Sequence, residues 1–364
     1  MSANQPPSPP RPTLTIDGEQ LEFAPGETIY EVAQRRRASI PTLCYDARLE
    51  PFGSCRLCAV EVEGSRTPVA SCSTKAVAGM NVHTATPQLE EYRRTLLEMV
   101  VSENRQVEAD PLSGSASQEF KGLVDRYEAR TGRFAGARSG HSKTEDTNPF
   151  ILRDYEQCIS CYRCVRVCAE REGDHAINIA NRGFHSQITT EFDQLLRDSS
   201  CTFCGQCVQT CPTGALADRK ALRATSLPEP LEQTRTVCAY CGVGCSVEVL
   251  TKGERMVGIR PVMDGPANQG ALCVKGQFAF DFVQHPDRLK TPLVRGDDGQ
   301  LHPASWDEAL DRAAQGFRQA FQRHGRHSIY AIASGRAPNE AAYLTQKFIR
   351  AGNGTHQIDN CSRA

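Results

Sequence analysis

The sequence predicts an α+β chain built from several small domains in series, and its length and cysteines are the first reasons. The chain has 364 residues, which suggests two or three domains. Its 17 cysteines form four groups of four with one left over, and long stretches without cysteine separate most of the groups. Short strand-like and helix-like segments alternate with these groups, which favours small mixed domains organised around cysteine.

Composition and charge narrow the class of protein. The formal net charge is -1 and 23% of residues are charged, so no electrostatic reason exists to expect a nucleic acid partner. No window approaches the roughly 18 apolar residues that span a membrane, so we expect no direct membrane insertion. Residues 1–12 resemble a disordered tail without a secretory leader. Grouped cysteines that stay reduced predict a cytoplasmic location.

The first cysteine group follows two predicted strands, Thr13–Ile16 and Gln20–Phe23, and a predicted helix, Ile29–Arg37. Its spacing is C-x10-C-x2-C-x13-C, and its members are Cys44, Cys55, Cys58 and Cys72. Four thiolates of which two come from one tight turn suit a two-iron cluster. The same C-x2-C turn also suits zinc, so spacing alone leaves both open.

The residues around this group carry a resemblance. Residues 42–45 (TLCY), 55–58 (CRLC) and 70–72 (ASC) resemble the N-terminal ferredoxin domain of the large iron–sulphur subunit of respiratory complex I. The same domain opens iron hydrogenases and NAD-linked formate dehydrogenases. The resemblance implies a β-grasp domain over residues 13–88 that binds one 2Fe-2S cluster.

Residues 89–150 are expected to form a helical spacer. Leu89–Val101 has apolar spacing suited to a helix, and residues 104–141 are polar. In the resembled family this region usually holds a further four-iron cluster on one His and three Cys. Residues 86–150 contain no cysteine, so that cluster is predicted to be missing here.

The strongest pattern lies in residues 151–225. The run C-x2-C-x2-C-x3-C occurs twice, as Cys158, Cys161, Cys164 and Cys168, and as Cys201, Cys204, Cys207 and Cys211. In bacterial two-cluster ferredoxins the fourth cysteine of each run binds the other cluster. The pattern therefore predicts one 4Fe-4S cluster on Cys158, Cys161, Cys164 and Cys211. It predicts a second on Cys201, Cys204, Cys207 and Cys168.

The fourth group, over residues 234–288, consists of Cys238, Cys241, Cys245 and Cys273. Gly242 and Gly244 permit the backbone to wrap closely around a bulky group, although spacing alone would also suit zinc. The segment CAYCGVGC resembles the opening of the molybdenum- or tungsten-bis(pyranopterin) oxidoreductases. That resemblance implies a third 4Fe-4S cluster, with Lys275 as an electron-relay contact to the pterin. Without the resemblance, Lys275 is open to a second reading as an exposed surface lysine.

Residues 289–364 predict the start of an α/β domain. Ser305 is a candidate N-cap, completed by Glu308, for a helix over 306–323. A buried parallel strand is expected over 328–333 and a helix over 341–352. The turn between them is either a plain βα connection or a phosphate site at a helix N-terminus. The resemblance favours pterin–nucleotide binding, with Ser334, Gly335, Asn339 and Glu340 as candidates.

Residues 359–364 (DNCSRA) resemble the formate dehydrogenase segment that directly precedes a metal-ligating cysteine or selenocysteine. No catalytic residue is therefore expected within the chain, because that ligand would follow Ala364. Cys361 is expected to be a packing thiol, since the other 16 cysteines fill four sites.

These expectations define one multidomain α+β chain. It comprises a β-grasp two-iron ferredoxin domain, a helical spacer, a two-cluster ferredoxin domain and the start of a bis(pyranopterin) oxidoreductase domain. The resemblance implies the electron-transfer portion of a formate dehydrogenase large subunit, with Mo or W on bis(molybdopterin guanine dinucleotide) in the full protein. Implied partners are a flavin- and NAD-handling subunit, a hydrogenase or a ferredoxin. A stand-alone electron-transfer subunit and a complex I-type subunit are the alternatives.

The final residues generate a prediction about the gene. If a selenocysteine ligand follows Ala364, the next codon is UGA and the open frame continues with a histidine codon. Sequencing the DNA downstream of codon 364 reads this directly. Any other codon, or a frame that closes, contradicts the selenocysteine hypothesis.

Overall fold

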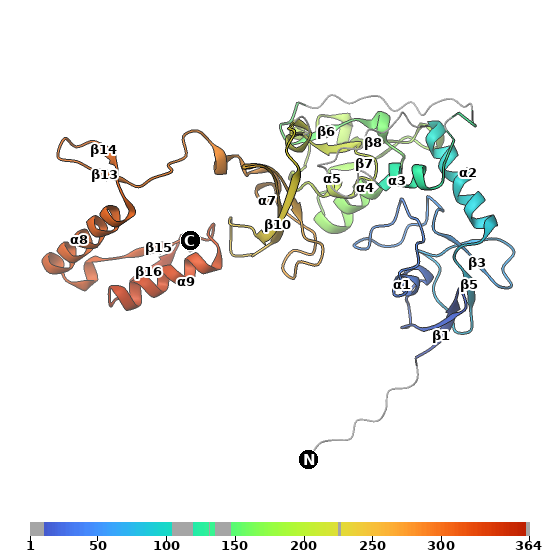
Figure 1. Cartoon of the computed structure of the whole chain (residues 1–364), viewed down its shortest axis with the longest axis horizontal. Coiled ribbons are helices and arrows are strands. Elements are labelled where there is room, and N and C mark those ends of the chain that lie inside the picture. The colour runs from blue at the N-terminus through green and yellow to red at the C-terminus, as the bar shows by residue number, and fades with distance from the viewer. Residues whose placement is uncertain (1–10, 104–118, 131, 135–146, 225–226, 362–364) are drawn as a thin grey trace, which may run out of the picture. The chain divides into compact units, whose positions relative to one another are not determined.

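The computed structural model describes residues 11–103, 119–130, 132–134, 147–224 and 227–361. The chain divides into two compact units, Met1–Ser226 and Leu227–Ala364 (Figure 1). Among the helices of the described residues, none combines the length and the apolar character needed to cross a bilayer. Most of the tail expected over 1–12 and of the polar stretch over 104–141 lies outside the described residues, as do residues 362–364.

The first domain is built on a five-stranded mixed sheet. Its strands lie in the order β2-β1-β5-β3-β4, with β1 and β5 parallel and the other neighbours antiparallel. Their bounds are β1 Thr13–Ile16, β2 Glu19–Glu22, β3 Ala59–Val62, β4 Val69–Ala70 and β5 Asn81–His83. Helix α1, Ile29–Gln34, ends before the predicted Arg37, which has a left-handed backbone (φ 56°). The observed order places β1 in the sheet interior.

The core of this domain joins α1 to the sheet and includes two of the cysteines. The core residues that are at most 1% exposed include Leu14, Ile16, Ile29, Val32, Val60 and Val82. Cys58 and Cys72 belong to the same buried cluster. A capping box starts α1: Thr28 Oγ1 accepts from the Glu31 N–H at 3.2 Å, and Glu31 Oε2 accepts from the Thr28 N–H at 2.7 Å. The two thiols are therefore held by a well-packed core.

Helix α2, Pro87–Glu103, is attached to this domain by a fully buried arginine, Arg93. The guanidinium donates to three main-chain oxygens, those of Leu57 at 3.3 Å and of Ala59 and Thr84 at 2.8 Å each. It also pairs with Glu90 at 2.8 Å. Leu57 and Ala59 flank Cys58, so Arg93 fixes the backbone on both sides of that cysteine.

A second helix of the spacer, α3 (Glu119–Arg126), completes a second apolar cluster. Its buried members are Leu43, Leu57, Leu97, Phe120, Tyr127 and Ala129. Cys55 and Ile159 pack against the same cluster. The spacer thus joins the first domain to the next one by apolar contact.

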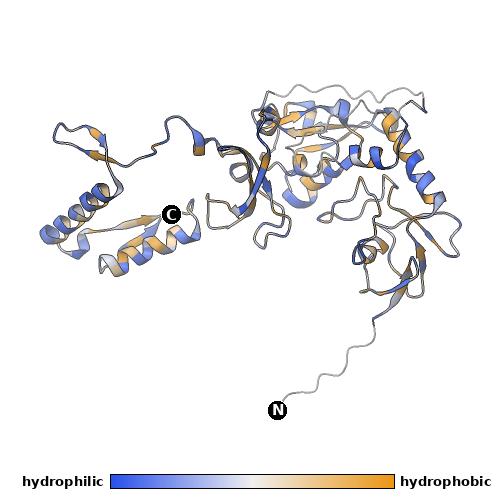
Figure 2. Cartoon of the chain, in the orientation of Figure 1, coloured by the Kyte–Doolittle hydropathy of each residue, from blue (hydrophilic) through white to orange (hydrophobic). Residues whose placement is uncertain are grey.

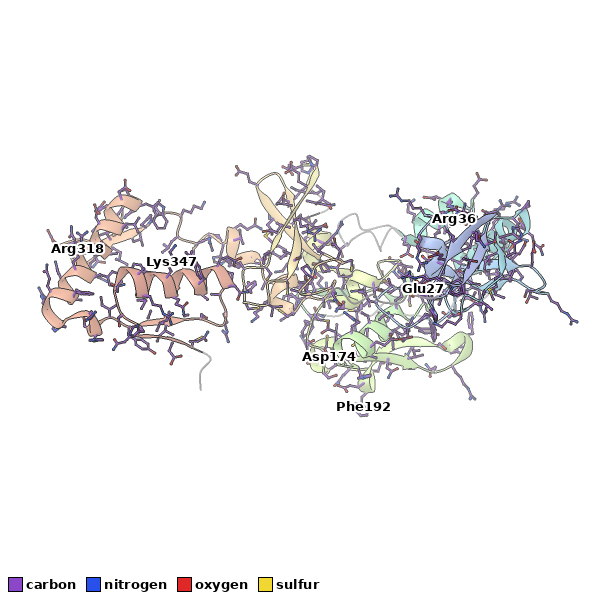
Figure 3. The ribbon with its side chains drawn as sticks, turned by 90° about the horizontal axis from the view of Figure 1, so that it is seen from below. Glu27, Arg36, Asp174, Phe192, Arg318 and Lys347 are labelled. Atoms are coloured by element: carbon purple, nitrogen blue, oxygen red, sulfur yellow. The ribbon has the colours of Figure 1, made fainter. Side chains whose placement is uncertain are left out.

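The second domain contains two similar halves. Its strands form two antiparallel pairs, β6 (Ile151–Arg153) with β9 (Leu216–Asp218), and β7 (Ile177–Ala180) with β8 (Gln187–Thr190). Its helices are α4 Arg163–Val167, α5 Gln206–Thr210 and α6 Arg219–Arg223. Helices α4 and α5 lie side by side (Figure 1). Phe192, in the loop after β8, projects into solvent and is 98% exposed (Figure 3).

The second unit begins with an antiparallel three-stranded sheet in the order β10-β11-β12. Its strands are β10 Leu231–Val237, β11 Ser246–Lys252 and β12 Arg255–Pro261, followed by helix α7, Val274–Phe278. A hairpin of β13 (Leu293–Arg295) and β14 (Leu301–Pro303) precedes helix α8, Trp306–His324. The parallel pair β15 (Ala331–Ala333) and β16 (Ile358–Asn360) encloses helix α9, Asn339–Lys347, in sequence.

The last elements partly correct the sequence expectations. Ser305 caps α8, since its Oγ accepts from the Glu308 N–H at 3.1 Å. The strand expected over 328–333 is shorter, because residues 326–328 form a 3-10 turn, and it is not buried. Ile332 is 67% exposed although the strand is hydrophobic in Figure 2. The described sheet has only two strands here, and two strands are too few to form a buried core by themselves.

Arg93 generates a stability prediction. Arg93→Met keeps the side-chain length but leaves three buried carbonyls without their donor, so we expect a loss of about 3 kcal/mol in the first domain. Hydrogen exchange of the 57–62 backbone measures it. Arg94→Met is the matched control, because the Arg94 side chain is 40% exposed. Equal exchange in both variants contradicts the role of Arg93.

Candidate iron–sulphur centres

The first cysteine group is arranged as two pairs of thiols. The Sγ atoms of Cys58 and Cys72 lie 3.3 Å apart, and the Cys55 N–H donates to Cys44 Sγ at 3.5 Å. Cys44, Cys58 and Cys72 are each 1% exposed. The pKa of Cys44 is lowered by hydrogen bonds from Cys55, and the same contact raises the pKa of Cys55. Contact with Cys72 likewise lowers the pKa of Cys58, while that of Cys72 rises.

This pairing matches the requirement of a two-iron cluster. Each of its two irons takes two protein thiolates, so the protein must offer two pairs rather than one tight quartet. Four thiolates on one zinc ion would all lie about 3.8 Å apart, because Zn–S bonds are about 2.3 Å long. In the part of the chain that the structure describes, no three His, Cys, Asp or Glu side chains are placed to hold a single metal ion. The arrangement of the thiols in two pairs therefore fits a two-iron cluster.

The eight cysteines of the second domain line two separate cavities. The first is lined by Cys158, Cys161, Cys164 and Cys211. The second is lined by Cys168, Cys201, Cys204 and Cys207. Each cavity thus receives three thiols from one loop and the fourth from the end of the other run. Apolar side chains such as Ile188 and Leu216 in the first, and Ile177 and Leu196 in the second, complete the walls.

Burial makes these thiols poor acids unless a cation is bound. Burial raises the pKa of Cys158 to about 11 and the pKa values of Cys161 and Cys204 to about 12 each. The pKa values of Cys164 and Cys207 are raised further, by burial and by the neighbouring thiols. Four thiolates in one such cavity repel one another, and bound iron removes that repulsion and replaces the protons. The cavities therefore fit a cationic group that takes four thiolate ligands, such as the iron–sulphur core of a four-iron cluster.

The backbone at both cavities follows the same unusual path. Ser160 (φ 51°) and Tyr162 (φ 60°) are left-handed in the first loop, and Phe203 (φ 55°) and Gly205 (φ 77°) are left-handed at the same places in the second. The path turns main-chain N–H groups towards sulphur: Ser160 donates to Cys158 Sγ at 3.4 Å and Phe203 to Cys201 Sγ at 3.3 Å. Such hydrogen bonds to sulphur tune the reduction potential of a cluster.

The fourth group lies at the edge of the three-stranded sheet of the second unit. The Cys238 N–H donates to the carbonyl of Cys245 at 2.8 Å, which closes the loop. Burial and the neighbouring thiols raise the pKa of both cysteines. Cys273 is the N-cap residue of α7 and is exposed. Lys275 is also exposed, and its charge only partly offsets the rise in the pKa of Cys238 that burial causes.

The pterin candidates lie around the end of β15 and the start of α9. Ser334 and Gly335 directly follow β15, and Asn339 and Glu340 begin α9. Asn339 Nδ2 donates at 2.8 Å to the carbonyl of Gly242, in the fourth cysteine loop. A Cβ on Gly242 would lie 2.7 Å from Asn339 Oδ1, so a larger residue there would displace the Asn339 amide.

Cys361 differs from its expected role. The sequence predicts a thiol packed in a core, but Cys361 is exposed, and its Sγ lies 3.6 Å from Ser334 Oγ. It follows β16, which is parallel to β15, so Cys361 and Ser334 lie at the same edge of the two-stranded sheet. The physical reason is again that this sheet has only two strands among the described residues, and little packs over its ends.

Models of known protein families match the chain in four consecutive segments. They are "2Fe-2S iron-sulfur cluster binding domain" over 11–87, "NADH-quinone oxidoreductase subunit 3, ferredoxin-like domain" over 148–217, "Molybdopterin oxidoreductase Fe4S4 domain" over 231–285 and "Molybdopterin oxidoreductase" over 288–364. Residues 231–285 and 288–364 are therefore similar to molybdopterin oxidoreductases. The matches confirm the mixed α/β multidomain architecture that the sequence predicts.

Individual curated relatives match nearly the whole chain. A protein of Rhizobium meliloti (strain 1021), named as one of the subunits of NADH-quinone oxidoreductase, is 36% identical over 351 residues, covering 96% of this chain and 40% of the relative. A protein of Staphylococcus aureus (strain USA300) named "Putative formate dehydrogenase" is 30% identical over 387 residues, covering 96% of this chain and 39% of the relative. The chain therefore spans about two fifths of the length of these relatives.

A solved structure also resembles the chain. It is a chain of an NAD+-reducing [NiFe]-hydrogenase in the H2-reduced state, with 29% identity and a TM-score of 0.51. The match covers 60% of this chain and 90% of that one. The relatives are thus named for NADH-quinone oxidoreductase, formate dehydrogenase and NAD+-reducing hydrogenase, and the family models that match the chain describe iron–sulphur and molybdopterin domains.

Sequence reasoning missed three residues around these sites. Arg93 clamps the backbone beside Cys58, and Arg166 of α4 donates to the carbonyl of Cys44 at 3.4 Å. Asp174 accepts from both the N–H and the hydroxyl of Thr202, next to Cys201. No motif marks these residues, because each acts on a segment distant in sequence. The charge of Arg93, in an otherwise apolar stripe of α2, is the one available signal.

The crossed cavities generate a prediction about ligands. If Cys211 completes the first cavity, Cys211→Ser should perturb the same four-iron EPR signal as Cys158→Ser, and Cys168→Ser the same signal as Cys201→Ser. Each variant should also bind less iron. EPR of the reduced protein distinguishes the two signals. Cys361→Ser is the control and should leave both unchanged; Cys211→Ser acting on the Cys201 signal contradicts the crossing.

Proposed function

We propose that this chain is the electron-transfer portion of the large subunit of a cytoplasmic formate dehydrogenase. The observation that carries the proposal is the fourth cysteine loop, which Asn339 joins to the start of the pterin-type domain by its hydrogen bond to the Gly242 carbonyl. The staphylococcal relative named as a formate dehydrogenase supports the substrate. Formate would be oxidised to CO2 in the full-length enzyme, with two electrons leaving for a partner subunit.

The residues of this chain have separate roles in the proposal. The thiolates of the 16 grouped cysteines would hold one 2Fe-2S and three 4Fe-4S clusters. When bound, such clusters accept and release one electron at a time. The apolar walls of the two cavities exclude water, and the N–H groups of Ser160 and Phe203 stabilise sulphur charge. Lys275 adds a positive charge near Cys238, and the pterin-type domain follows Lys275 in the sequence.

The proposal extends to groups that only the full-length protein would bind. The carboxyl edge of β15 and β16, with Ser334, Gly335, Asn339 and Glu340, would contact bis(molybdopterin guanine dinucleotide) carrying Mo or W. Strand, small-residue turn and helix N-terminus are suited to phosphate groups. A cysteine or selenocysteine ligand to the metal stays a prediction from residues 359–364. A flavin- and NAD-handling subunit, a hydrogenase or a ferredoxin would receive the electrons.

A complex I-type subunit is the second candidate. It is favoured by the Rhizobium relative, which is 36% identical over 96% of this chain. In that case the pterin-type domain would carry no metal and the electrons would come from NADH. A stand-alone electron-transfer subunit without a catalytic metal is the third. Metal content therefore distinguishes the first candidate from the other two.

One experiment on the native full-length complex tests the proposal. We expect about one Mo or W per chain by elemental analysis, and formate should reduce a viologen dye and bleach the visible absorbance of the clusters. Lys275→Met should slow this bleaching at unchanged metal and iron content, because it removes the charge beside Cys238; Lys290→Met, at an exposed position, is the control. A complex without Mo or W that is reduced by NADH alone would show a complex I-type subunit instead.

A further inference from the structure

The loop between Cys44 and Cys55 contains ten residues, more than the four of plant-type ferredoxins. Its residues 46–52 reach across to the second domain and contact it at three places. Both domains lie in the same compact unit, residues 1–226. We define residues 46–52 as the docking arm.

The first contact is a partly buried ion pair. Arg48 and Asp46 pair at 2.7 Å, and each side chain is 12% exposed. The pair then binds α5 from both members: Arg48 donates to Gln206 Oε1 at 2.7 Å, and Asp46 accepts from Thr210 Oγ1 at 2.8 Å. Gln206 and Thr210 are each 2% exposed, so these hydrogen bonds are shielded from water. A pair in this position fixes both the distance and the orientation of the arm on α5.

The second contact joins the arm backbone to α4 and the turn after it. The Glu50 N–H donates to Glu170 Oε2 at 2.8 Å, and the Glu50 carbonyl accepts from Arg166. Arg166 also pairs with Glu170 at 3.1 Å and donates to the Cys44 carbonyl at 3.4 Å. One arginine therefore holds the arm and a two-iron ligand together.

The third contact is aromatic. The ring of Phe52 meets that of Tyr162 edge-on, with centroids 6.1 Å apart, and the Arg166 guanidinium lies 5.2 Å from the Phe52 centroid. Phe52 is 48% exposed, so this contact adds to the arm without forming a core. Such edge and cation–π contacts favour a defined geometry over a sliding one.

All three contacts meet the second domain beside cysteines of its two cavities. Thr210 and Gln206 directly precede Cys211 and Cys207, Tyr162 directly follows Cys161, and Arg166 lies between Cys164 and Cys168. Beside the arm the two domains are separated by an open groove, walled by the arm itself, by Glu31 and Lys75, and by Glu170 and Arg171. The arm is thus a bridge along one side of this groove.

We propose that the docking arm fixes the two-iron site at a set distance from the four-iron sites, with Asp46, Arg48 and Arg166 as positioning residues. The inference rests on the proposed cluster assignment. One electron leaves one cluster and enters the other, with no proton or bond change, so the protein controls this step only through distance, orientation and local charge. Because the further four-iron cluster that the resembled family holds in the spacer is predicted to be missing, this direct contact, together with the apolar cluster of the spacer, connects the two domains among the described residues.

The test uses the full-length holoenzyme carrying Arg48→Met together with Phe52→Ala. We expect unchanged iron content and an unchanged two-iron EPR spectrum, but loss of most of the relaxation enhancement that reduced four-iron clusters impose on that signal. Electron transfer between the two sites should slow by about tenfold or more. Arg171→Met, in the same groove but exposed, is the matched control. Arg48→Lys should restore part of the enhancement.

The outcomes separate the two proposals. Unchanged relaxation enhancement in the double variant, with both clusters present, overturns the docking arm and leaves the cluster assignment intact. A wild-type protein without a two-iron signal overturns both. If the double variant loses iron, Phe52→Ala alone is the second variant, because a half-exposed ring is not needed for the fold. Reduced enhancement in that variant supports the arm, and an unchanged value overturns it.

Discussion

The structure depends on one electrostatic constraint: several thiols that must become thiolates are buried together. Burial raises the pKa of Cys158, Cys161 and Cys204, and each additional thiolate in a cavity raises those of its neighbours. Only a group of high positive charge relieves this repulsion. Cluster binding and folding are therefore coupled, because no bound group holds the loops together when that charge is absent.

The same constraint explains the architecture of the second domain. Its two halves exchange their fourth cysteines, so each cavity is closed by residues from both. Neither half can complete a cavity alone, which makes the pair of helices α4 and α5 a single unit. The proposed docking arm is anchored to this unit, because its partners Gln206, Thr210 and Arg166 lie on those helices.

Agreement between sequence and structure is greatest where the controlling interactions are local. The strand Thr13–Ile16 and the cap of α8 at Ser305 depend on residues within a few positions, and both occur as predicted. The strand at 328–333 and the thiol of Cys361 are predicted to be buried, and such burial depends on further strands. With two strands described in that sheet, Ile332 and Cys361 are exposed instead, although Ile329 is buried.

The sequence by itself determined the number of cysteine groups and the residues in each, because ligand spacing in a tight loop is a local property. Only the tertiary structure decided that Cys44 pairs with Cys55 and Cys58 with Cys72, and that Arg93 clamps the backbone beside Cys58. It alone brought Arg48 to Gln206, 158 positions away, and Asn339 to Gly242, 97 positions away. The physical reason is that these contacts join segments whose proximity is set by packing of whole domains, which no local pattern records.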